Sequence, residues 1–284
     1  MTTITKTKVY TLTAIAALLY VGLTIAFADG LWNLNNFWYS PTTADDPTKY
    51  IFGGTWVTYV LLIATVGLGL FQAQRLGDVQ VDVTPNTDAE VDGQVEDPTF
   101  WKLLVGNTWY AILWLPLRFF VGQEWLSAGE HKVRSDAWMD GGAALKGYFE
   151  NAVAVPESGR PAITYDWFRQ FLQYMLDHEW YTWFAKIVAV GEVLVGLGLI
   201  FGALVGIAAF FGTVMNFNFL LAGSASTNPV LFGLSVFIVL GWKVAGHLGL
   251  DRWLLPLLGT PWKRGPIRKE ARDERPLVHR QHPA

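Results

Sequence analysis

Cysteine is absent from the 284 residues, and this absence excludes several kinds of chemistry at once. A chain without cysteine has no disulfide framework, no thiol redox centre and no thiolate ligands for an iron–sulfur cluster. If the protein takes part in redox chemistry, its electrons must pass to a bound organic cofactor, a haem or a partner subunit.

Charge is also scarce. Charged residues make up 16% of the chain, below the roughly 25% that is typical of soluble domains. The net charge is −3, and no basic stripe is long enough to follow a phosphate backbone. These two observations exclude a nucleic-acid partner.

Long apolar runs are abundant instead, since 52% of the residues are hydrophobic. The runs cover residues 9–28, 51–73, 103–126, 180–200, 201–222 and 230–250. Each is about 20 residues long, which is enough for a helix to cross the ~30 Å hydrocarbon core of a bilayer. The 14 tryptophans fit aromatic belts at the two membrane surfaces. The sequence therefore predicts an all-α polytopic membrane protein, with the lipid bilayer as its first partner.

Composition divides the chain into four parts. We expect two N-terminal transmembrane helices in residues 1–75 and an acidic cytoplasmic linker in 76–99. A four-helix membrane domain with an outer insertion at 130–179 follows in 100–262, and a basic cytoplasmic tail in 263–284.

Basic residues orient the chain. Lys6, Lys8, Arg75, Lys102 and the basic tail fall on one side if the six runs alternate, so the positive-inside rule predicts a multi-pass protein of the cell membrane with both termini in the cytoplasm. The first run ends in Ala26-Phe27-Ala28, like a signal-peptide cleavage site. It is longer than the usual apolar core of a signal peptide, which favours a retained helix.

Three polar side chains inside the runs are the main candidates for function. Counting about 1.5 Å per residue along straight helices places Arg118, Glu192 and Asn216 at similar depths, so we expect them to converge. Ionisable groups inside a membrane are costly and usually face the bundle interior. Such a cluster could be a structural lock in which Arg118 and Glu192 neutralise each other, or a site for a polar headgroup such as a quinone carbonyl, or a proton relay.

Histidine gives little support for a metal or a haem. His131, His178 and His247 do not place two imidazoles at one depth within the membrane, so we expect no bis-histidine haem. His131 and His178 could approach each other at the outer surface and bind zinc, or be solvated loop residues. We expect the second alternative, and therefore no metal.

The second half of the chain resembles the DoxX/DoxD family of small four-helix membrane proteins. The resemblance is carried by three groups of residues. They are Leu117-Arg118 with Gly122, Ser127-Ala128-Gly129 and Lys132; Gly191-Glu192 with Gly196, Leu199 and Gly202; and Met215-Asn216-Phe217-Asn218.

The resemblance implies a four-helix DoxX-like bundle with two additional N-terminal helices. It also implies an integral membrane subunit of a quinone-linked oxidoreductase, with thiosulfate:quinone oxidoreductase as the associated activity and quinone as the cofactor. The residues that it singles out are Arg118 and Glu192 as catalytic groups and Lys132, Asn216 and Asn218 as substrate-binding groups. An alternative stays open, in which the chain is a non-catalytic scaffold or anchor for a redox partner. A small partner subunit and a homo-oligomer are further alternatives, whereas a transporter is disfavoured because no inverted repeat is evident.

Overall fold

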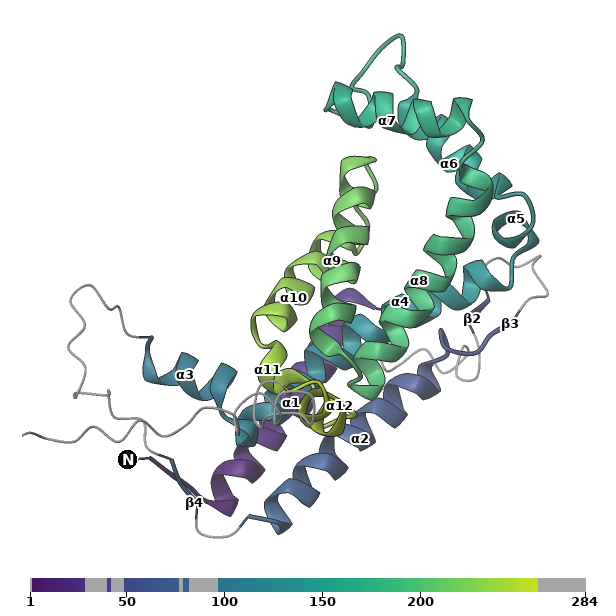
Figure 1. Ribbon diagram of the computed structural model, residues 1–284. Helices are drawn as coiled ribbons and strands as arrows, with labels where there is room; N and C mark the ends of the chain where they lie inside the picture. Colours follow the sequence, from purple (N-terminus) through teal and green to yellow (C-terminus); the bar gives the residue numbers. More distant parts are fainter. Residues whose placement is uncertain (1, 29–39, 42–48, 77–78, 82–96, 260–284) are drawn as a thin grey trace, which may run out of the picture.

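The structure is a computed structural model that describes residues 2–28, 40–41, 49–76, 79–81 and 97–259, and it is predominantly helical (Figure 1). The helices are α1 (Lys6–Phe27), α2 (Thr55–Gln74), α3 (Thr99–Gly106), the 3-10 helix η2 (Thr108–Trp114), α4 (Leu115–Val133), α5 (Asp136–Met139), α6 (Ala143–Val153), α7 (Asp166–Asp177), α8 (Tyr181–Phe201), α9 (Val205–Leu221), α10 (Asn228–Leu240), α11 (Trp242–Ala245) and α12 (Asp251–Leu257). Two short antiparallel pairings join β1 (Thr2–Ile4) to β4 (Val79–Val81) and β2 (Ser40–Pro41) to β3 (Lys49–Tyr50). The expected helical architecture is confirmed at this level.

Fewer helices than expected are long enough to span a bilayer. Among the described residues α1, α2 and α8 qualify, and α3 with η2 and α4 would form a fourth, broken span. With 17 and 13 residues, α9 and α10 reach only about 25 and 20 Å along their axes, short of the ~30 Å hydrocarbon core. The prediction of six uninterrupted spans is wrong for the third run, which bends by 85°, and for the sixth, which breaks at Gly241.

The bend in the third run has a local cause. The side chain of Asn107 accepts a hydrogen bond of 2.9 Å from the Trp109 amide, so a new helix begins there instead of α3 continuing. Across the bend, the indole Nε1 of Trp114 donates to the Leu104 carbonyl at 2.9 Å. Pro116 lies in the first turn of α4, where its missing N–H costs nothing. The straight part of this run therefore starts at η2, several residues later than the apolar pattern indicates.

Glycines hold α4 and α8 together as a close antiparallel pair. A Cβ at Gly129 would lie 2.6 Å from the Val193 amide nitrogen, and one at Gly196 would lie 2.6 Å from that of Leu126. Small residues are what allow membrane helices to pack this closely. The spacing of Gly122 and Gly129 in the sequence predicts this approach, and the structure confirms it.

A tight turn joins α8 to α9. Gly202 adopts a left-handed conformation with φ of 68°, and the Ala203 amide donates to the Gly198 carbonyl at 2.8 Å. This is the usual way in which a glycine ends a helix. Because almost no loop separates the apolar runs 180–200 and 201–222, the sequence predicts a tight antiparallel pair. The two helices do reverse at this turn, but α8 and α9 diverge as they leave it, as Figure 1 shows.

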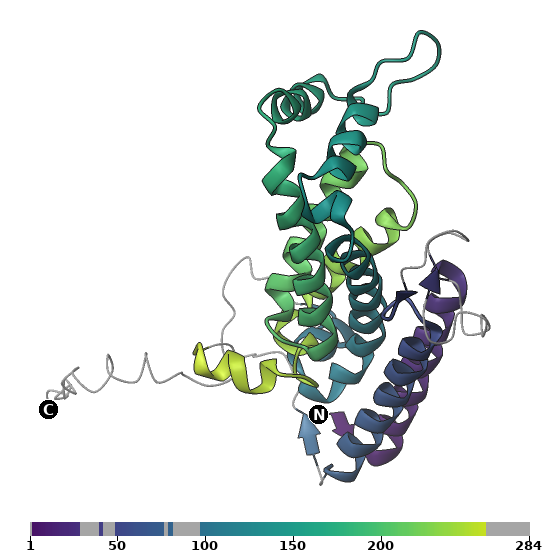
Figure 2. The same ribbon diagram turned by 90° about the vertical axis from the view of Figure 1, so that its right-hand side faces the viewer.

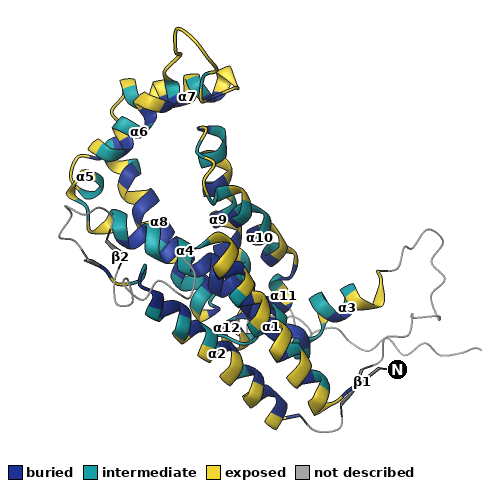
Figure 3. Cartoon of the chain, turned by 180° about the vertical axis from the view of Figure 1, so that it is seen from behind, coloured by how far each residue is buried: buried dark blue, intermediate teal, exposed yellow. Residues whose placement is uncertain are grey.

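The N-terminal hairpin of α1 and α2 packs beside α4 and leaves much of its own surface exposed (Figures 2 and 3). Tyr20 of α1 donates to Gln123 of α4 at 2.9 Å, and Gln123 in turn donates to Thr58 of α2 at 2.8 Å. The exposed faces carry apolar side chains such as Leu18 and Ile63, as expected for contact with lipid.

The segment between α4 and α8 caps one end of the bundle. The apolar spacing in residues 166–177 predicts an amphipathic helix that lies on the membrane or caps the bundle. These residues form α7, which lies across the open ends of α8 and α9 (Figure 1). The spacing places five apolar side chains on one face, and of these Phe168, Leu172 and Met175 are buried against α6, whereas Trp167 and Phe171 are exposed. Most of the acidic linker and the whole basic tail lie outside the described residues.

Candidate functional site

Arg118 is completely buried and binds backbone oxygens at the C-terminal end of α8. Figure 1 shows this end of α8 on the side of the bundle opposite α7. Its Nε donates to the Leu199 carbonyl at 2.9 Å and its Nη2 to the Ile200 carbonyl at 3.2 Å, in the last turn of α8. Its Nη1 donates to the Ala245 carbonyl at 2.8 Å and lies 3.4 Å from that of Leu248. The guanidinium thus satisfies carbonyls that a helix end leaves without partners, and it ties α8 to the chain after α10.

Asp251 is an anion close to this arrangement. Its carboxylate accepts hydrogen bonds from the amides of Leu204 at 2.6 Å and Val205 at 2.9 Å, at the start of α9. It also attracts Arg118 electrostatically. A cation at the C-terminus of α8 and an anion at the N-terminus of α9 each complement a helix dipole.

Glu192 does not reach Arg118. Its carboxylate lies 2.6 Å from the Nζ atom of Lys132, and the exposed fractions of the two side chains are 1% and 17%. Glu192 packs beside Gly129, whereas Arg118 packs beside Gly202. The 11 residues that separate Gly129 from Arg118 on α4 correspond to about 16 Å along a helix.

The expected convergence of Arg118, Glu192 and Asn216 is therefore wrong for Arg118. The depth estimate assumed a straight helix from residue 103, but the bend at Asn107 places Arg118 only a few residues into α4. The expectation that Arg118 and Glu192 neutralise each other is wrong for the same reason. Of the five candidate residues, the structure brings Lys132 and Glu192 into direct contact.

The two asparagines occupy different environments. Asn216 is fully buried, and neither polar atom of its amide has a hydrogen-bond partner within the described part of the chain. It lies on α9 at about the level of Glu192, because neighbouring Met215 faces Gly191. Asn218 is exposed, and its amide donates to the Val214 carbonyl of its own helix at 2.8 Å.

The Lys132–Glu192 pair has an aromatic neighbour. The Lys132 ammonium lies 5.1 Å from the ring centroid of Trp138, within the range of a cation–π interaction. Because Glu192 is almost fully buried and Lys132 partly exposed, the pair joins the bundle interior to the surface. Chemically it offers an ammonium donor to an anion or a carbonyl, and a carboxylate that can exchange a proton.

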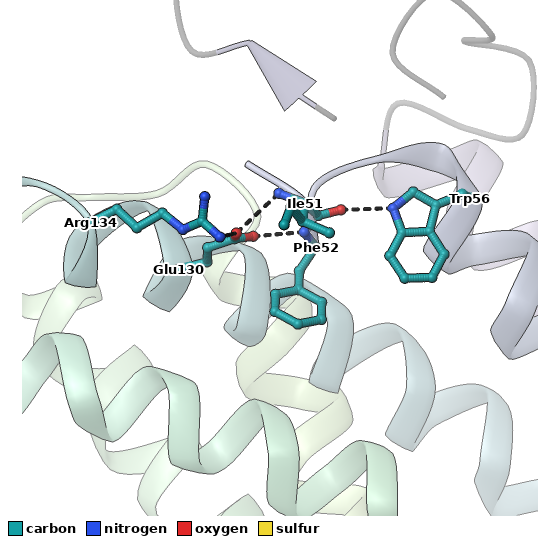
Figure 4. A network of polar contacts seen from close by, with 5 residues as sticks. All are labelled: Ile51, Phe52, Trp56, Glu130 and Arg134. Atoms are coloured by element: carbon teal, nitrogen blue, oxygen red, sulfur yellow. Dashed lines mark hydrogen bonds and ion pairs between the residues drawn. The ribbon is translucent and has the colours of Figure 1, made fainter. Parts of the chain in front are cut away.

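Glu130 forms a second buried polar contact, which the sequence reasoning missed. Its carboxylate accepts hydrogen bonds from the amides of Ile51 at 3.0 Å and Phe52 at 2.6 Å, and lies 2.9 Å from Nη2 of Arg134 (Figure 4). The indole of Trp56 donates to the Ile51 carbonyl at 3.0 Å. Glu130 thus fastens the start of the α2 segment to α4. A glutamate one turn before an arginine was the available signal, but such pairs are usually surface features.

The histidines do not form a metal site in the described residues. His131 stacks on Tyr50 with ring centroids 4.5 Å apart, and His178 stacks on Tyr174 at 3.9 Å. No group of three or more metal-binding side chains occurs in the part of the chain that the structure describes. His131 and His178 therefore each have an aromatic partner of their own.

An apolar cavity of about 780 Å³ lies between the diverging helices α8 and α9 and beneath α6 and α7. Its lining includes Tyr148, Phe171, Gly191, Leu194, Phe211 and Asn218. Burial raises the pKa of the Tyr148 phenol above its ordinary value, so this group stays neutral at physiological pH. On α8 the cavity residues Val188 and Val195 lie one turn to either side of Glu192, so the ion pair is close to the cavity wall.

Comparison of the chain with protein-family models, with curated proteins and with solved structures finds no match.

Proposed function

We propose that this protein is an integral membrane subunit of a quinone-linked oxidoreductase, and that its reaction is the oxidation of thiosulfate by quinone. The observation that carries the proposal is the contact between the partly exposed Lys132 and the buried Glu192, an ion pair in a helical bundle with apolar surroundings. Burying such a pair is costly, and ionisable groups inside membrane spans usually serve a function. The order of the DoxX/DoxD-like motifs along the chain supports the choice of reaction.

The chemistry divides between the two side chains. Two thiosulfate anions each give up one electron as a bond forms between their terminal sulfurs, and the quinone takes up two electrons and two protons. Lys132, which is partly exposed, would attract the anion or donate to a quinone carbonyl, and Glu192 would pass protons. Asn216 and Asn218 remain candidate substrate contacts, whereas Arg118 positions α8 without touching the substrate.

The proposal includes a membrane orientation. The DoxX-like bundle would consist of α4, α8, α9 and α10 in the cell membrane, with both chain termini in the cytoplasm. Pairing of β1 with β4 brings the start of α1 and the end of α2 to one end of the molecule, so Lys6 and Arg75 lie at that end. The cap formed by α5, α6 and α7 lies at the other end, which would face outward (Figure 1).

The test is thiosulfate-dependent reduction of a soluble quinone by membranes that carry Glu192→Gln or Lys132→Met. Gln keeps the size and hydrogen-bonding capacity of Glu but cannot release a proton or balance the ammonium. We expect both variants to lose activity while inserting normally. Lys146→Met is the matched control, since Lys146 is exposed and its partner Glu150, whose carboxylate is 3.8 Å away, is exposed as well. Wild-type turnover in the Gln variant would end the catalytic interpretation of Glu192.

A second candidate function, a non-catalytic scaffold for a redox partner, is favoured by one observation. Arg118, the other buried ion expected in the site, is occupied by backbone carbonyls and holds helices together. If the Lys132–Glu192 pair is a similar lock, Glu192→Gln lowers thermal stability because it leaves a poorly solvated ammonium unpaired. The double variant Lys132→Leu with Glu192→Leu then restores stability, and a quinone assay detects no activity in any variant.

A further inference from the structure

The apolar cavity between α8 and α9 is large for a packed protein interior. Native proteins retain few voids larger than a water molecule, whereas this cavity measures about 780 Å³. Its lining along α8 runs from Phe184 to Phe201, about 26 Å at the usual rise per residue. The rim side chains Leu194 and Phe211 are 62% and 55% exposed, so the cavity opens at the side of the bundle. It is therefore elongated and accessible from the surroundings of a membrane-spanning helix.

We propose that this cavity is a binding site for one membrane phospholipid, with an acyl chain lying between α8 and α9. Water binds poorly to an apolar lining because it finds few hydrogen-bond partners there, so an apolar molecule fills such a site more favourably. In a bilayer the hydrocarbon chains of lipids surround the open side. The site is distinct from the Lys132–Glu192 pair and does not depend on the redox function proposed above.

The low polarity of the lining favours an acyl chain over a quinone ring. Tyr148 and Asn218 supply the side-chain oxygen and nitrogen atoms of the cavity lining. The other lining residues are aliphatic, aromatic, methionine or glycine. The Asn218 amide already donates to its own helix. A quinone needs donors for two carbonyl oxygens, whereas an acyl chain needs none.

The charges at the α7 end of the cavity fit a phosphate. Lys186 is exposed on the second turn of α8, one residue before Ile187 of the cavity lining. Lysines near the end of a membrane helix extend their ammonium toward the headgroup layer. Lys146, on α6 at the same end, has its ammonium 5.6 Å from the Tyr181 ring and 3.8 Å from the exposed Glu150 carboxylate. A headgroup at this end would place the acyl chain along α8 toward the α8–α9 turn.

The test uses the full chain reconstituted in vesicles of phosphatidylcholine and phosphatidylglycerol, extracted in mild detergent and weighed by native mass spectrometry. The cavity variant is Gly191→Leu, because a Cβ at Gly191 meets only the Met215 sulfur, at an ordinary 3.6 Å. The control is Gly67→Leu on the exposed face of α2, where a Cβ meets nothing within 4 Å. We expect one retained phospholipid in the wild type and in the control. Retention should fall about tenfold in Gly191→Leu, since displacing even two methylene groups weakens binding by that factor.

Several results would overturn the proposal. They are equal retention in the two leucine variants, a wild type that keeps no phospholipid, a bound mass that matches an isoprenoid quinone, and a lipid-free dimer in which a second copy covers the cavity. If Gly191→Leu fails to fold, wild-type protein in vesicles of phosphatidylcholine with a photoreactive group at mid-chain decides the question. Crosslinks concentrated on residues 184–219 support the site, and equal labelling of α1 and α2 contradicts it.

Discussion

Replacing Arg118 by methionine tests how the bundle is held together. The side chain is fully buried, and three of its hydrogen bonds to backbone carbonyls measure 2.8, 2.9 and 3.2 Å. A hydrogen bond from a charged donor contributes roughly 1.5–3 kcal/mol, and methionine leaves the carbonyls without partners. Removal of the buried cation also removes its desolvation cost, which offsets part of this loss.

We expect the free energy of unfolding to fall by about 3–5 kcal/mol, the range seen when one member of a buried charged arrangement is removed. Arg118→Lys should lie between methionine and wild type, because an ammonium keeps the charge but cannot span the carbonyls of both segments. The assay is unfolding in mixed detergent micelles followed by tryptophan fluorescence. The control is Arg160→Met at an exposed loop position, expected within about 0.5 kcal/mol of wild type. Coincident unfolding curves for the two methionine variants would refute the reasoning.

Two further predictions concern close contacts elsewhere. Gly249→Ala should destabilise the protein by about 1–3 kcal/mol, since its Cβ would lie 2.7 Å from backbone atoms at the end of α8. Gly67→Ala, on an open helix face, should be neutral or stabilising. Unfolding in micelles measures both variants, and equal effects would contradict the packing argument. Glu130→Ala should speed hydrogen exchange at the Ile51 amide about tenfold, because the carboxylate that accepts from it is removed. Glu150→Ala, at a side chain that is 56% exposed, should leave that amide unchanged, and protection that survives in the Glu130 variant would show that the contact does not hold the segment.

The helical architecture follows from composition because lipid admits few alternatives. Apolar runs of about 20 residues must satisfy their backbone groups internally, and a helix does so. Gly122 and Gly129, spaced by seven residues, predict a face where another helix approaches, and α8 packs there. These features depend on short stretches of sequence and on the solvent, so they can be deduced without knowledge of the partner helix.

The bend at Asn107 could not be deduced in the same way. Apolar residues continue on both sides of the break. The bend is decided by local capping by the Asn107 side chain together with a hydrogen bond from Trp114 to the Leu104 carbonyl. A polar residue within an apolar run is compatible with a continuous helix, a kink or a break. The choice among them shifted the start of the straight helix, and this shift displaced Arg118 from the depth at which Glu192 lies.

The partner of Glu192 depended on a register that the sequence leaves open. A turn of three residues separates α8 from α9, so the chain length nearly fixes their relative depth. The sequence places Asn216 and Glu192 at similar depths, and the contact between Met215 and Gly191 agrees with this. Between α4 and α8 lie 47 residues that form a cap of their own, which permits many registers. The packing of glycines on α4 and α8 against the backbone of the other helix selects one register, and in this register Lys132 contacts Glu192.

The same turn explains why a fully buried arginine needs no carboxylate in direct contact. The C-terminus of α8 presents carbonyls and a negative dipole end, and Arg118 donates to the carbonyls of Leu199 and Ile200 there. Three residues later the N-terminus of α9 presents amides and a positive dipole end, to which Asp251 is bound. Each ion is thus solvated by a helix end of opposite polarity, and the two attract each other across the turn. Arg118 and Asp251 therefore satisfy carbonyls and amides that the two helix ends leave without intrahelical partners, and this role does not depend on whether the protein catalyses a reaction.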